Sequence, residues 1–97
     1  MLTSKQKSYL KSLAHNLNPV FQIGKDGIND NMKYDIVAYL AKHELMKVTI
    51  LNNSDVTKEE ATSIFEDVNI EVVQTIGRIL VLYKPSKKAK NPIILPR

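Results

Sequence analysis

The fold is decided by the stretch VFQIGKDGINDNMKYDIVAYLAKHELMKVTIL, residues 20–51. Its first four residues are typical of a short strand, which runs directly into a loop with glycine at both ends, residues 24–27. Asn29 or Asp30 can cap the helix that follows, and residues 46–51 have the composition of a second strand. Because a helical crossover between two strands favours a parallel pair, this stretch predicts a β-α-β unit.

Downstream, the chain predicts a third helix and a hairpin. Thr57 and Glu60 have the spacing of a reciprocal capping box, and the apolar residues after them recur with helical periodicity. Residues 70–76 and 79–83 are typical strands, and only Gly77-Arg78 separates them. Glycine at the first position of a two-residue connection is what a type II′ turn requires, so we expect this last pair to be antiparallel.

Upstream, Thr3 or Ser4 can cap a first helix that runs to about Asn16. One face of this helix carries an apolar stripe at three- and four-residue spacing, and a neighbouring line of basic side chains forms a ridge that we expect to face solvent. The stripe consists of Tyr9, Leu10, Leu13, Ala14 and Leu17, and the ridge of Lys7, Lys11 and His15.

The element order is therefore α-β-α-β-α-β-β, in the α/β (α+β) class. We expect a four-stranded mixed sheet with three helices packed on it and a GxxG loop between the first strand and the second helix. Residues 1–85 form the predicted single domain, and residues 86–97 form a basic C-terminal tail, in which residues 93–95 are apolar enough to return to the body.

Length and composition narrow the function classes. A chain of 97 residues has room for one small core and no large enclosed cavity. The absence of cysteine excludes disulfides, thiolate zinc sites, iron–sulfur clusters and cysteine nucleophiles, and is typical of a protein of the reducing cytosol. The N-terminal residues lead into no apolar stretch of signal-peptide length, and the longest apolar run, residues 79–83, is far shorter than a membrane span. We therefore expect a cytoplasmic protein without membrane contact.

The net charge of +4 conceals a segregation along the chain. Residues 1–25 carry four lysines and no acid, and residues 77–97 carry six basic side chains and no acid. All ten acids lie between Asp26 and Glu71, together with four lysines. Clustered positive charge attracts polyanions through its long-range field and through counterion release, although basic chain ends can also serve solubility alone.

The GxxG loop, residues 24–27, is the best candidate for chemistry. It lies between a strand and a helix start, where free amides and the positive end of the helix can meet a phosphate, and glycine lets a nucleic-acid backbone approach closely. Two glycines three residues apart can equally mark a tight turn. Tyr83, beside Lys84, is the aromatic residue whose basic neighbourhood best fits base stacking.

No motif supports catalysis or a cofactor. The nucleotide-hydrolysing glycine loop and the dinucleotide-binding GxGxxG are absent, and no serine has the context of a nucleophile. His15 and His43 lack metal-ligand spacing, so we expect no metal site. His43 lies on the apolar stripe of its helix, which favours a packed core or helix-end histidine, whereas His15 is placed to contact phosphate or base.

Several segments together resemble the YhbY-like proteins built from a single CRM domain (chloroplast RNA splicing and ribosome maturation). The similar segments cover nearly the whole chain, and their ordered set is more specific than any one of them. They are Lys5-Gln6, Leu10-Lys11-Ser12-Leu13-Ala14-His15, Leu17-Asn18-Pro19, Ile23-Gly24-Lys25-Asp26-Gly27, His43-Glu44-Leu45-Met46-Lys47-Val48, Ile76-Gly77-Arg78-Ile79-Leu80-Val81-Leu82-Tyr83-Lys84-Pro85 and Leu95-Pro96-Arg97.

The resemblance implies a compact RNA-binding domain with a KH-like GxxG loop, similar in topology to the C-terminal domain of a bacterial translation initiation factor. It also implies association with ribosomal RNA of the precursor large subunit in bacteria, and hence a role in ribosome assembly. We expect a monomer without enzymatic activity. The implied RNA contacts are Gly24, Lys25 and Gly27 in the loop and Lys5, Lys7, Lys11, Arg78 and Lys84 on a basic surface, to which the basic tail adds Lys87 and Lys88.

Two points of this prediction remain open. Asp26 departs from a fully favourable loop, because a carboxylate at the apex repels phosphate unless it points away. We also expect the first helix, the loop and the final hairpin to combine into one basic surface. The alternative to RNA binding is an adaptor whose acidic middle and apolar residues 93–95 contact a ribosomal protein or assembly factor.

Overall fold

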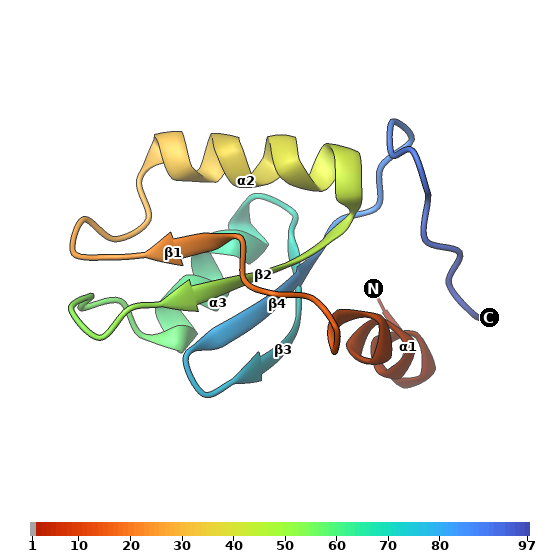
Figure 1. Cartoon of the computed structure of the whole chain (residues 1–97), viewed down its shortest axis with the longest axis horizontal. Helices are drawn as coiled ribbons and strands as arrows, with labels where there is room; N and C mark the ends of the chain where they lie inside the picture. Colours follow the sequence, from red (N-terminus) through yellow and green to blue (C-terminus); the bar gives the residue numbers. More distant parts are fainter. Residues whose placement is uncertain (1) are drawn as a thin grey trace.

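Four strands form one mixed sheet in the order β1-β2-β4-β3, as the computed structural model of residues 2–97 shows (Figure 1). β1 pairs with β2 in parallel, with Phe21 opposite Val48, whereas β4 is antiparallel to both β2 and β3. This topology confirms the predicted mixed sheet and the element order. The elements are α1 (Ser4–Ala14), β1 (Phe21–Ile23), α2 (Asp30–His43), β2 (Leu45–Ile50), α3 (Lys58–Asp67), β3 (Glu71–Ile76) and β4 (Ile79–Tyr83).

Each helix begins at a side chain that satisfies free backbone N–H groups. Asn29 caps α2 by accepting the N–H of Met32 at 2.8 Å. Thr57 and Glu60 form the predicted capping box of α3, in which the Thr57 hydroxyl accepts the Glu60 N–H at 3.1 Å. Thr3 caps α1 through a second capping box, so all three helix starts follow from local sequence.

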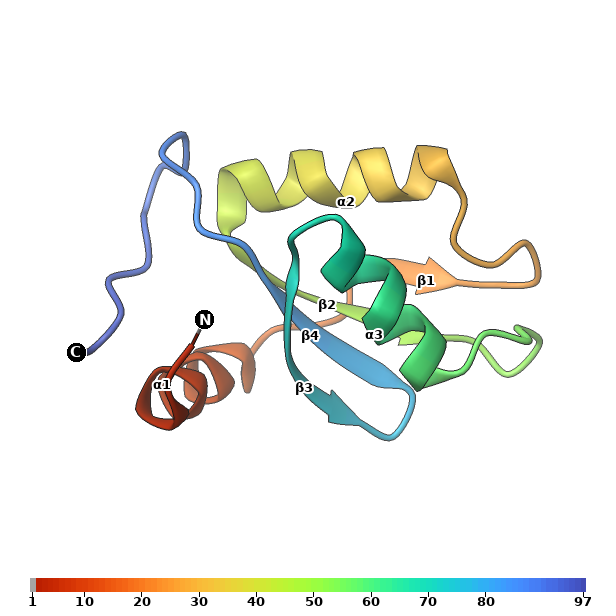
Figure 2. The ribbon, with the colours of Figure 1, turned by 180° about the vertical axis from the view of Figure 1, so that it is seen from behind.

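The sheet separates two hydrophobic clusters. α2 and α3 cover one face, and Figure 2 shows α3 lying across it. α1 and the C-terminal segment cover part of the other face. The first cluster contains Ile23, Ile36, Leu40, Met46, Val48, Ile50, Ala61, Phe65, Ile70, Leu80 and Leu82. The second contains Leu10, Ala14, Leu45, Val73, Val81 and Tyr83, with Leu2, Ile93 and Leu95 packed against it.

The alternation of side chains along the strands explains how one sheet serves both clusters. On β4, Leu80 and Leu82 enter the first cluster, whereas Val81 and Tyr83 enter the second. The β3-β4 turn has Gly77 at φ 57°, and Arg78 is not among the residues with positive φ, which agrees with the predicted type II′ turn.

Two predictions about exposure need correction, those for the apolar stripe of α1 and for Tyr83. In α1 only Leu10 and Ala14 of the apolar stripe are buried, and Tyr9, Leu13 and Leu17 are more than a third exposed, because α1 covers only part of its sheet face. His43 is exposed at the end of α2, which agrees with the predicted helix-end alternative, and its ring lies 4.2 Å from that of Tyr39. Tyr83, which we expected to be available for base stacking, is 3% exposed within the second cluster.

The C-terminal segment returns to the body. Ile93 and Leu95 pack against the second cluster, and the Gln6 side chain donates a hydrogen bond to the Pro96 carbonyl at 3.0 Å. The two chain ends therefore meet beside α1 (Figure 1). In residues 2–97 no helix combines the length and apolar character needed to span a membrane.

Candidate nucleic-acid interface

The GxxG loop is a hydrogen-bonded turn between β1 and α2. The Gly27 N–H donates to the Gly24 carbonyl at 3.0 Å, and Gly27 has φ 69°. A Cβ at Gly27 would lie 3.4 Å from Val56 Cγ2, so glycine suits both the backbone conformation and the limited space. Lys25 and Asp26 occupy the exposed tip. The loop is thus a tight turn, and it exposes Lys25 in the segment that leads into α2.

Arg78 belongs to the β3-β4 turn, and this turn lies in the same half of the molecule as the loop (Figure 1). Its Nε donates to the Ile50 carbonyl at 2.9 Å and its Nη2 donates to the Leu51 carbonyl at 3.0 Å. These bonds tie the hairpin turn to the end of β2. Since a guanidinium has five N–H donors, Arg78 keeps donors for a ligand while it holds the loop end together.

The predicted contact residues fall into three groups, which corrects the expectation of one basic surface. Lys25 and Arg78 lie at the loop end, whereas α1 with Lys5, Lys7 and Lys11 lies at the opposite end of a molecule 39 Å long (Figures 1 and 2). The sequence order of basic segments gave no information on this separation, because the sheet sends the loop and the chain ends in opposite directions. The third group, near the C-terminal end of α2, consists of Lys84, Lys87 and Lys88.

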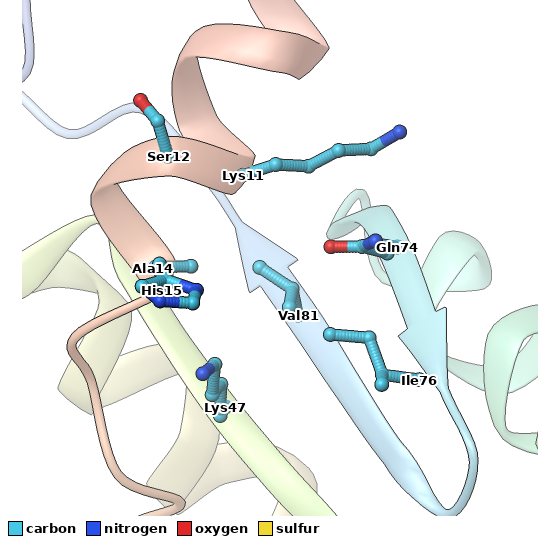
Figure 3. Close-up of a pocket in the computed structure, with 8 residues that line it drawn as sticks. All are labelled: Lys11, Ser12, Ala14, His15, Lys47, Gln74, Ile76 and Val81. Carbon is cyan, nitrogen blue, oxygen red and sulfur yellow. The ribbon is translucent and has the colours of Figure 1, made fainter.

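A groove runs between α1 and the open part of the sheet, with a volume of about 320 Å³ (Figure 3). Lys11 extends from α1 across it towards Gln74, and Ile76 and Val81 lie along the strands below. Lys47 also lines it, and its Nζ donates to the Leu17 carbonyl at 3.0 Å. Among the described residues no acid lines the groove, so it carries positive charge over an apolar floor.

The basic side chains are not neutralised by acids at contact distance. Within residues 2–97 the structure has a single ion pair, between Lys33 and Asp30 at 3.4 Å, and neither residue belongs to the predicted interface. The Lys84 Nζ donates to the Asn69 carbonyl at 3.3 Å, so this residue also has a structural contact. Asp26 is exposed beside Lys25 and forms no ion pair with it.

Sequence reasoning missed several residues of the basic and aromatic surface. Tyr34, on α2, is 75% exposed, and its position off the apolar stripe of that helix is the signal that could have indicated this. Lys47 lines the groove because it follows Met46 on β2, whose side chain lies in the first cluster on the opposite face of the sheet. Lys42 and Lys90 line a hollow together with Lys88. The contribution of Lys42 and Lys90 depends on the path of residues 86–93, which no local pattern specifies.

Comparison with known proteins places this geometry in a family. The sequence model that describes the CRS1/YhbY (CRM) domain family matches residues 2–84 of this chain. The chain belongs to the CRM domain family. This confirms the resemblance inferred from the sequence, and it covers all seven helices and strands.

Three known proteins match this chain along nearly the whole of their own length. The chain is 47% identical over 92 residues to YqeI of Bacillus subtilis, named a probable RNA-binding protein, with 94% of this chain and 96% of that protein covered. It is 44% identical over 97 residues to an RNA-binding protein of Haemophilus influenzae, with 99% and 96% covered. The solution structure of a Staphylococcus aureus protein, described as a candidate RNA-binding protein, has 52% identity and a TM-score of 0.78, with 99% of this chain and 100% of that chain covered. The CRM domain therefore accounts for residues 2–84, and the likeness to the Staphylococcus aureus structure extends over nearly the full chain.

Proposed function

We propose that the protein binds RNA, and that its RNA is the ribosomal RNA of the precursor large subunit, whose assembly it assists without catalysing a reaction. RNA binding is supported chiefly by one relative, which is named an RNA-binding protein. It matches this chain at 44% identity over nearly the full length of both proteins. The large-subunit target rests on the resemblance of the sequence to YhbY-like proteins. The lysines free of carboxylate contacts in residues 2–97 support a polyanionic ligand.

The mechanism we infer is phosphate binding from the loop end. Lys25 supplies a mobile ammonium at the tip of the turn, and Gly24 and Gly27 allow a phosphate to approach the amides at the start of α2. Lys5, Lys7 and Lys11 on α1, of which Lys11 lines the groove, add phosphate contacts at the far end of the molecule. Each phosphate neutralised by a lysine releases counterions, so affinity falls as salt concentration rises.

Lys25→Gln tests the loop. We expect a threefold to tenfold weaker binding of a single-stranded RNA at ~0.1 M salt, and a salt slope smaller by about 0.7, because one phosphate contact is lost. Fluorescence anisotropy titrations over a range of KCl concentrations measure both quantities. Ser63→Glu, at an exposed position of α3, changes the net charge by the same amount away from the loop and is the matched control. Equal losses in both variants would contradict a local contact at Lys25.

The ribosomal target needs a cellular measurement. Ultraviolet crosslinking followed by sequencing of the attached RNA should recover fragments enriched in large-subunit ribosomal RNA, and Lys25→Gln should reduce their yield. Reads spread over messenger RNA without that enrichment would contradict the assembly role and leave RNA binding intact.

The adaptor alternative has less surface than the sequence suggested. Ile93 and Leu95 pack within the protein, so Ile94, at 84% exposure, is the only one of these three residues that is largely available to a partner. Association with precursor particles that survives both RNase and high salt would favour the adaptor over RNA binding.

A further inference from the structure

Glu44 is a buried carboxylate with an unusual backbone. It follows α2 in the left-handed conformation, φ 65°, where glycine or asparagine is preferred, and it is 3% exposed. Its Oε2 accepts the Ser86 N–H at 2.7 Å and its Oε1 accepts the Ile93 N–H at 2.6 Å. The left-handed backbone of Glu44 costs free energy, and its carboxylate accepts hydrogen bonds from two backbone N–H groups. Glu44 therefore anchors the C-terminal segment at Ser86 and Ile93.

The two amides lie at the ends of a short basic loop. Residues 87–92 have the sequence KKAKNP, so three of the six side chains in this loop are lysines. The Ser86 hydroxyl donates to the Ala41 carbonyl at 2.6 Å and accepts the Lys88 N–H at 3.1 Å, which fixes the first turn of the loop on α2. Glu44 and Ser86 therefore hold the loop at both ends, although it contains no helix or strand.

Between this loop and the end of α2 lies a hollow of about 500 Å³, lined by Lys42, His43, Lys88, Lys90 and Asn91. None of the described residues that line it is acidic. The His43 ring is held by its contact with Tyr39. Lys42 and His43 also suit the negative end of the helix dipole, but that effect does not account for two further lysines brought from a loop anchored by a buried carboxylate.

We propose that this hollow is a second RNA-binding site, which takes backbone phosphates and for which Glu44 is the positioning residue. The inference rests on the RNA binding proposed above and adds a place to it. α2 has 14 residues, so it is about 20 Å long at ~1.5 Å per residue, with the GxxG loop before its first turn and the hollow at its last (Figure 1). The protein therefore contacts RNA at both ends of α2.

The lysines give the direct test. Lys88→Gln and Lys90→Gln, each compared with Ser63→Glu as the charge-matched control, are titrated against a fluorescein-labelled 20-nucleotide oligouridine over a range of KCl concentrations. We expect each lysine variant to bind threefold to tenfold more weakly, with a salt slope smaller by about 0.7. Affinity and slope equal to those of Ser63→Glu in both variants would overturn the inference and leave the hollow to an acidic partner of another class.

Glu44→Gln tests the positioning role, because it replaces one of the two accepting oxygens with an NH2 group, which faces one of the two backbone N–H groups as a second donor. We expect a smaller salt slope although every lysine is retained, in a protein that circular dichroism shows to be folded. An unchanged slope in folded Glu44→Gln would overturn the role of Glu44. If Glu44→Gln does not fold, the exposed lysines still decide whether the hollow binds RNA.

The two proposals fail in different ways. Weaker binding by Lys25→Gln together with unaffected Lys88→Gln and Lys90→Gln would overturn the second site alone. Weaker binding by Lys88→Gln and Lys90→Gln, without enrichment of large-subunit ribosomal RNA in cells, would support the second site and contradict the assembly role. Failure of the wild-type protein to bind the oligouridine, together with failure to recover any crosslinked RNA from cells, would overturn both.

Discussion

Tyr83 shows how the second cluster affects a single residue. Its burial, and to a lesser degree the negative charge of Glu44, raises the pKa of the phenol above its ordinary value of 10.0. The folded protein therefore keeps the phenolic proton at pH values where the unfolded chain has lost it. This contribution to stability is fully present below pH 10.0 and is lost as the pH rises through the folded-state pKa.

We predict that Tyr83→Phe removes this part of the alkaline loss of stability. Urea unfolding of the wild-type protein and the variant between pH 9 and 11 measures it, and the difference between the two proteins should change with pH only above about 10. Titration of tyrosinate absorbance should also lose its highest-pH component in the variant. A pH-independent difference between the two unfolding free energies would contradict the raised pKa.

The reach of sequence reasoning differs sharply between residues. Thr57 and Glu60 were predicted as a capping box because they are three positions apart, and they form one. The sequence indicates no anchoring role for Glu44, because the hydrogen-bond partners of its side chain are 42 and 49 residues away and are backbone groups, which carry no side-chain signature. Interactions between residues close in the sequence leave a recognisable pattern, whereas interactions between residues that only the fold brings together do not.

At the scale of elements, α1 shows why helical periodicity overstates burial. The stripe from Tyr9 to Leu17 has the spacing of a core face, but α1 lies against only part of the sheet and buries Leu10 and Ala14. Strands are less prone to this error, because both faces of β2 and β4 are defined by alternation and all of β4 except Ile79 is buried. The groove of Figure 3 exists because α1 leaves the remaining sheet uncovered.

The capping box of α3 provides a prediction at this scale. Thr57→Ala removes the hydroxyl that accepts the Glu60 N–H, and we expect the free energy of unfolding to fall by about 1 kcal/mol. Thr57→Ser keeps the oxygen and should retain most of the stability. Urea unfolding measures both variants. A loss in Thr57→Ser as large as in Thr57→Ala would show that the threonine methyl, rather than the cap, stabilises α3.

At the scale of the molecule, the segregation of charge along the sequence indicated the class of partner but not where the basic side chains lie on the surface. Basic segments at both ends of the sequence predicted a polyanionic partner, and the CRM family match supports that partner. Their expected union failed because the sheet separates the GxxG loop from α1. Three basic regions on a molecule 39 Å long suit a folded RNA that offers phosphates from several directions better than a single strand lying in one channel.

The C-terminal segment returns to the body of the molecule and packs against the cluster to which α1 contributes. Two adjacent isoleucines in this segment provide a matched test of that packing. Ile93 packs against the second cluster, whereas Ile94 is 84% exposed. We expect Ile93→Ala to lower the free energy of unfolding by about 1–2 kcal/mol, and Ile94→Ala to change it by less than about 0.5 kcal/mol.

Ile93→Ala should also speed amide hydrogen exchange in α1 more than in α3, because α1 contributes residues to the cluster against which Ile93 packs, whereas α3 contributes none. Urea unfolding and exchange measured by mass spectrometry on the two variants give both readouts. Equal, small effects of the two substitutions would mean that residues 86–97 behave in solution as a tail. A selective effect of Ile93→Ala would instead make these residues part of the domain, and would explain how a loop of lysines is held in place beside α2.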